Sequence, residues 1–251
     1  MLQLLNKFRL AFVALAAFAL MGCGNPTIVE DTAELDQAFI PLLYLSERAD
    51  TTTVEAIRIF DRFVRRWHLF YGNYYTANQI NPKWGAGLDQ INQQVNAIED
   101  SLVDRRSLSG IHTMLESIRD DMIHLRRENQ IAYALDEFNT FHRIMEPLWE
   151  SAAEMETEPT RAEQFIKPIL RGLTDAEKQW KRVQMVRIDP MLYGLSPDEE
   201  KQLRAGIQTI QITLNQLNTA INNRDSDTII SLLKTVKQDF ATIYLLFGDF
   251  D

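Results

Sequence analysis

The spacing of apolar residues constrains the fold of this 251-residue chain more than any other feature. Apolar side chains recur at three- and four-residue intervals through most of the sequence, and few stretches show the alternation of period two that marks a strand. Such spacing gives each segment one apolar stripe, which a helix buries against other helices. The sequence therefore predicts an all-α fold that is stabilised by packing between helices.

Capping signals show where these helices begin. Ser196, Pro197 and Glu199 form a capping box with proline at the first helical position, and Thr52 and Thr174 each start a Thr-x-x-Glu pattern of the same kind. Together with the apolar stripes, these signals predict two sets of four helices. The first set covers residues 32–48, 52–71, 87–103 and 108–155, and the second covers 160–171, 174–188, 197–223 and 226–247.

The two sets resemble each other in sequence. Thr52 and Thr174 are 122 residues apart, and so are Tyr71 and Tyr193. The stretch FIPLL at residue 39 resembles FIKPIL at residue 165, and the apolar positions of the later helices match at offsets of 119 and 118. This pattern predicts two tandem antiparallel units, each like a four-helix bundle, related by internal duplication. The units cover residues 32–155 and 156–251, and one merged bundle is the alternative.

The long segment 108–155 offers two ways to join the units. Its apolar stripe passes through Ile111 and Met122 in the first half, but through Phe138 and Met145 on nearly the opposite side in the second half. The change occurs at RRENQ, residues 126–130. Either the helix breaks there, or one continuous helix buries opposite faces in two cores.

The only cysteine of the chain, Cys23, cannot form an intrachain disulfide. Before it lie two basic residues and an uncharged apolar run, 10–20, that is too short to span a bilayer. The residues Leu20, Met21, Gly22 and Cys23 resemble the lipobox of bacterial lipoproteins. The resemblance implies a signal peptide at 1–22, lipidation of Cys23 and a lipid-attached tether at 23–31, whereas the alternative is an ordinary secretory leader.

The residue after Cys23 indicates in which membrane the protein is anchored, and the net charge of the chain indicates which partners it can bind. Gly24 stands where lipoproteins retained in the inner membrane typically have Asp, so the resemblance favours the outer membrane with the protein facing the periplasm. Loss of 1–22 removes two basic residues and no acid, which changes the net charge from −9 to −11. This acidic chain is a poor nucleic-acid binder. We expect membrane attachment through the lipid, and another envelope protein or a small ligand as partner.

A possible metal site involves His112 and Glu116, which are four residues apart and adjacent on one helical face. With Gly110 they resemble the Gly-x-His-x-x-Glu motif of imelysin-type proteins, although the glutamate here is one place late. Those proteins are lipid-anchored duplicated helical bundles associated with iron uptake, so the resemblance implies a metal ion as cofactor. His142, Met145 and Glu146 share another face and could offer a metal ion or a haem N, S and O ligands, but Met145 falls on the apolar stripe, which favours packing over ligation.

The densest aromatic cluster could form a binding surface. Its rings spread over a helix end and a loop, so they cannot all enter one narrow core stripe. Tyr and Trp combine rigid contact area with a polar tip, as partner surfaces do, while the alternative is a plug that closes the end of a bundle. The candidate residues are Trp67, Tyr71, Tyr74, Tyr75 and Trp84.

No catalytic pattern stands out. Ser231 and Lys234 have the spacing of a serine acyl-enzyme motif but lack its companion motifs, and the glycines are scattered rather than gathered in a phosphate-binding loop. The sequence thus predicts a binding or interaction module of the cell envelope rather than an enzyme, without a cofactor. Metal handling of the imelysin type is the alternative.

Overall fold

The computed structural model describes residues 27–48, 53–75, 82–103 and 108–250. Within these ranges the chain forms α-helices and short 3-10 turns and contains no strand, which confirms the all-α prediction. None of the described helices has the length and apolar character needed to cross a bilayer. The elements are α2 (Ile28–Glu47), α3 (Thr53–Tyr74), α4 (Pro82–Val103), α5 (Leu108–Glu128), α6 (Leu135–Thr157), η2 (Pro159–Arg161), α7 (Ala162–Met185), α8 (Pro197–Asn222), α9 (Ser226–Tyr244) and η3 (Leu245–Phe247).

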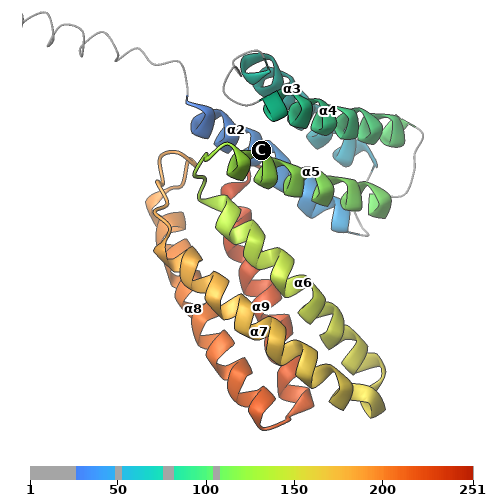
Figure 1. Cartoon of the computed structure of the whole chain (residues 1–251), viewed down its shortest axis with the longest axis vertical. Coiled ribbons are helices and arrows are strands. Elements are labelled where there is room, and N and C mark those ends of the chain that lie inside the picture. Colours follow the sequence, from blue (N-terminus) through green and yellow to red (C-terminus); the bar gives the residue numbers. More distant parts are fainter. Residues whose placement is uncertain (1–26, 49–52, 76–81, 104–107, 251) are drawn as a thin grey trace, which may run out of the picture.

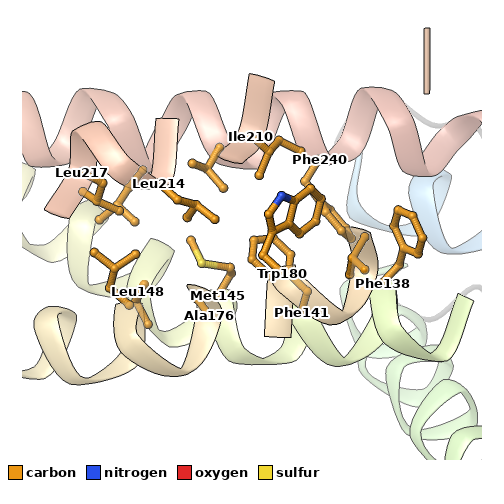
Figure 2. Packing of buried hydrophobic residues seen from close by; sticks show 14 of the residues in the cluster. Phe138, Phe141, Met145, Leu148, Ala176, Trp180, Ile210, Leu214, Leu217 and Phe240 are labelled. Atoms are coloured by element: carbon orange, nitrogen blue, oxygen red, sulfur yellow. The ribbon is translucent and has the colours of Figure 1, made fainter. Parts of the chain in front are cut away.

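The helices form two groups of four, α2 to α5 and α6 to α9 (Figure 1). In each group every helix contacts the next along the chain, and the fourth helix returns to contact the first. The second group has a core of large rings: Phe141 lies 4.5 Å from Trp180 between ring centroids, and Phe240 lies 5.5 Å from Phe141. Figure 2 shows these rings at one end of a longer apolar stack that continues through Met145 and Leu214.

Helix α2 belongs to both cores. Leu35, Phe39 and Leu42 pack with α3, α4 and α5, whereas Ala33 and Ile40 pack with the second group. A helix that is buried on two sides needs apolar residues round most of its circumference, and α2 has the run FIPLL in its centre. The two groups are therefore joined through a shared helix.

The C-terminal end of the chain also crosses between the groups. After α9, the segment through η3 reaches α2, where the Asp249 N–H donates to the Gln37 carbonyl at 2.8 Å. The Asp249 carboxylate lies 3.4 Å from the Arg62 guanidinium of α3. In Figure 1 the C-terminus is accordingly drawn beside α2.

The long segment 108–155 breaks after Glu128, so the first of the two alternatives is confirmed and the continuous helix is wrong. Gln130 has a φ of 58°, in the left-handed region, and the Ile131 N–H closes the turn on the Arg126 carbonyl at 2.9 Å. A buried ion pair spans the break, because the Arg126 Nε lies 3.1 Å from both carboxylate oxygens of Asp136. The change of apolar face is thus made by a turn.

Several predicted helix starts differ from the structure, and the helix predicted from residue 87 begins at Pro82. The predicted helices 160–171 and 174–188 are one helix, α7, in which the Thr174 hydroxyl donates back to the Leu170 carbonyl at 3.1 Å instead of capping a new helix. The first helix begins at Ile28 rather than residue 32, because Thr27 and Glu30 form a capping box. Residues 28–31 of the predicted tether are therefore helical. The capping box at Ser196 is confirmed, and Thr52 lies outside the described residues.

The internal duplication stays a prediction. Most of the apolar positions matched between α4 and α8, and between α5 and α9, are buried in both groups, as they would be in any pair of amphipathic helices, while Met114 and Leu232 are only partly buried. The match of Phe39 with Phe165 does not fit equivalent helices, since Phe39 lies in the first helix of its group and Phe165 in the second.

Candidate functional site

A cavity lies between the two helix groups, with walls from α2, α5, α6 and α9. The volume open to water-sized molecules within it is about 70 Å³, and all of its empty space, with the solvent at its open mouth included, is about 510 Å³. The apolar and aromatic part of the wall consists of Ile40, Leu43, Tyr44, Trp149, Phe240, Ala241, Tyr244 and Leu245. The polar part consists of Glu47, His112, Glu116, Arg119, His142 and Lys237. Both groups must be in place for this wall to exist.

Arg119 is the centre of the polar wall. It is only 5% exposed, and its Nη2 donates to the Glu116 carboxylate and lies 3.2 Å from Nδ1 of His142. A guanidinium can only donate, so His142 Nδ1 accepts and the imidazole hydrogen lies on Nε2. Burial and the nearby positive charges of Arg119 and Lys237 lower the pKa of His142 to about 3. His142 is therefore neutral at physiological pH.

His112 is held on the other side of Glu116. The Ser46 hydroxyl donates to the Leu43 carbonyl at 2.7 Å, so it accepts at 2.9 Å from Nδ1 of His112. His112 Nε2 then lies 3.7 Å from the Glu116 carboxylate. Burial raises the pKa of Glu116, while the charges of Arg119 and His112 oppose that rise. These contacts fix both side chains of the predicted metal pair.

Aromatic rings line the opposite wall. His142 meets Trp149 edge to face at 5.3 Å between centroids, and Phe240 stacks on Tyr244 at 5.5 Å. The ammonium of Lys237 lies 5.7 Å from the centre of the Trp149 ring and 3.0 Å from a Glu47 carboxylate oxygen. The wall therefore offers flat apolar surface next to a cation that already has a partner.

Two buried N–H groups of the lining residues have no hydrogen-bond partner among the described residues. They are Nε of Arg119 and Nε1 of Trp149. The other three tryptophans of the chain donate to Asn92 Oδ1, the Tyr74 carbonyl and the Ile207 carbonyl, at 2.9, 3.1 and 3.2 Å. Because buried polar groups are nearly always paired, an unpaired donor in a cavity wall needs an explanation.

The polar wall does not suit a metal ion. His112 and Glu116 both line the cavity, as the metal hypothesis requires, but the guanidinium of Arg119 already binds the Glu116 carboxylate and would repel a cation. Among the described residues, no group of three or more His, Cys, Asp or Glu side chains comes together to hold one. Met145, considered as a partner of His142, is fully buried in the core.

The aromatic cluster is mainly structural. Trp67 and Trp84 are buried at 0% and 2% exposure, so the hypothesis that they form a partner surface is wrong for these two residues. Tyr71 and Tyr74 are half-buried, and Tyr75 is 39% exposed and stacks on Tyr71 at 4.9 Å between centroids. The rings close the end of the first group where α3 meets α4, as the plug interpretation predicts.

Sequence reasoning missed most of the cavity wall. Arg119, Trp149 and Lys237 belong to three helices that are distant in the sequence, and no local pattern brings them together. One signal existed: Arg119 follows Ile111 and Leu115 at helical spacing, so a permanently charged residue stands on the buried stripe of α5.

No family model, curated protein or solved structure matches this chain. Cys23, the predicted lipidation site, lies outside the described residues. The candidate site is therefore assigned from the geometry of the cavity.

Proposed function

We propose that this protein is a lipid-anchored, periplasm-facing binding protein of the cell envelope that takes up a small ligand between its two helix groups. The cavity carries this proposal. Small-molecule sites are typically concave, mostly apolar and supplied with a few fixed polar groups, and they favour boundaries between structural units. A mainly apolar and partly aromatic wall that contains a buried Arg119 and a neutral His142 fits that description.

The chemistry of the wall favours binding over catalysis. A histidine with a pKa of about 3 is a poor general base near neutral pH, where catalytic bases need a pKa close to the working pH. The described lining contains no serine, threonine or cysteine that could act as a nucleophile. Glu116 is occupied by Arg119. These groups can orient a ligand without reacting with it.

The ligand can be sought by co-purification. The full-length protein, extracted from the membranes of cells that express it, should carry a small molecule that mass spectrometry detects after denaturation. Ala241→Leu adds three carbon atoms within the cavity wall, so we expect it to abolish this co-purification. Ala205→Leu places the same change on an exposed position of α8 and should leave the ligand in place. Equal recovery of the molecule from both variants would refute the assignment of the cavity.

The membrane anchor needs a separate test. We expect labelled palmitate to be incorporated into the wild-type protein and not into Cys23→Ser, which should also leave the membrane fraction. Two or more acyl chains hold a protein stably at a bilayer, whereas the acidic protein surface should not. An unlabelled wild-type protein would remove the envelope location from the proposal and leave the cavity unaffected.

A further inference from the structure

We propose that the ligand of the cavity is a small carboxylic acid with an aromatic or branched apolar body, bound as its carboxylate. This inference rests on the proposed function and adds the chemical class of the ligand. It follows from the hydrogen-bonding groups, the charge and the shape of the cavity wall.

The unpaired groups of the wall are donors. Nε of Arg119 and Nε1 of Trp149 both lack an acceptor, and both can only donate. Within the described part of the chain, buried oxygens that lack a partner belong to Gln94 and Asp239, neither of which lines the cavity. The head group of a fitting ligand must therefore accept hydrogen bonds. A carboxylate has two oxygens and accepts only, so it can satisfy donors on two sides.

The charges of the wall disfavour a cationic head group. Each acid already has its own cation: Glu116 binds Arg119, and Glu47 lies 3.0 Å from Lys237. An incoming ammonium group would find both carboxylates already paired with cations and would face two N–H groups that need acceptors, which it cannot supply. A carboxylate could instead accept hydrogen bonds from guanidinium N–H groups of Arg119 that Glu116 and His142 do not use, and hydrogen bonds to a charged group are the stronger ones.

The rest of the wall sets the shape of the body. The rings of Trp149 and Phe240 face the cavity with their centroids 6.4 Å apart, and Ile40 and Leu43 of α2 contribute aliphatic surface. A planar ring or a branched chain would cover this surface and exclude water from the head group. A long flexible chain would lose more conformational freedom for the same contact.

The test uses four probes that separate head group from body: phenylacetate, phenylacetamide, 2-phenylethylamine and acetate. Each is titrated into the nitrogen-labelled full-length protein in detergent, while two-dimensional NMR follows the indole N–H signals of the four tryptophans. We expect phenylacetate to bind at least about tenfold more tightly than 2-phenylethylamine, since a hydrogen bond to a charged group has about this effect. The amide should be intermediate, and acetate should bind too weakly to measure.

The indole signal of Trp149 is the one that is missing from the spectrum of Trp149→Phe. This signal should move downfield when phenylacetate is added to the wild-type protein. Trp149→Phe keeps an aromatic ring and removes the donor, so it should weaken phenylacetate binding about tenfold. Trp180→Phe removes a donor that is satisfied inside the core and should leave the affinity unchanged. The ranking of the probes on the wild-type protein does not depend on the folding of any variant.

The outcomes separate this inference from the proposed function. Tighter binding of the amine, equal binding of all three phenyl probes, or no binding of any probe would overturn the carboxylate assignment. The cavity would still stand as a ligand site if a small molecule co-purified with Ala205→Leu and not with Ala241→Leu. Loss of that difference would overturn the proposed function itself.

Discussion

Asp36 should make the folded protein less stable as the pH rises, which Asp36→Asn can test. Asp36 lies on α2 where the two helix groups meet. Burial raises the pKa of its carboxyl group from 3.8 to about 6, and Asp136 contributes to the rise, while the charges of Arg126 and Arg119 oppose it. The folded state therefore holds a proton that the unfolded state has released between about pH 4 and about pH 6. Over this window the free energy of unfolding should fall.

The magnitude follows from the two pKa values. A shift of one pKa unit corresponds to about 1.4 kcal/mol, so the full shift of Asp36 amounts to about 3 kcal/mol. The side chain is only partly buried by surface area, and screening by solvent reduces the effect to about 2 kcal/mol. Asparagine cannot ionise, so Asp36→Asn escapes this loss. Relative to wild type, the variant should gain about 2 kcal/mol between about pH 4 and about pH 8.

The assay is urea unfolding followed by circular dichroism, for wild type and variant, at several pH values across this range. Comparing the two proteins at each pH cancels the titration of all other groups and any constant effect of the substitution. Asp136→Asn is the contrasting variant: it leaves the buried Arg126 without its bidentate partner and should cost about 3 to 5 kcal/mol near neutral pH. A difference between Asp36→Asn and wild type that is constant or falls with pH would refute the reasoning.

Three further predictions concern packing, capping and a tyrosine. Gly206→Ala should destabilise the protein by about 1 to 3 kcal/mol in urea unfolding, because the new methyl group would collide with Ile243 of α9. Gly72 has open space around it, so Gly72→Ala is the control and should be neutral or stabilising. Ser196→Ala should cost about 1 kcal/mol in the same assay, and an unchanged midpoint would mean that the cap is not formed in solution. The hydrogen bond from Tyr71 to Asp89 raises the pKa of the tyrosine to about 12. Asp89→Asn should lower this pKa in an absorbance titration. An unchanged pKa would show that the hydrogen bond is not the cause of the shift.

The helices were predictable because their apolar spacing and caps are local properties of the sequence. The exception is α7, where Thr174 and Glu177 imitate a capping box in the middle of a helix. The Thr174 hydroxyl finds its acceptor one turn back, at Leu170, so the helix continues through the false signal. A capping pattern therefore marks a helix start only when tertiary packing ends the preceding helix there.

The cavity was not predictable in the same way. His112 and Glu116 were found because they are neighbours on one helix, and the metal hypothesis followed from their spacing and from the resemblance to the imelysin-type motif. The residue that changes the chemistry is Arg119, whose contact with His142 crosses from one helix group to the other. Such a contact depends on how α2 packs against both groups, and periodicity within a single helix contains no information about that arrangement.

The shared helix and the returning C-terminal segment have a consequence for cutting the chain. Cleavage at the exposed Gln130 would give an N-terminal fragment that keeps α2 and a C-terminal fragment that keeps Asp249. Each piece would expose apolar surface that the other covers in the intact chain, at Ile40 of α2 on one side and where η3 contacts α2 on the other. The nicked halves should therefore remain associated on a sizing column, and the molecule is suited to splitting into complementing fragments.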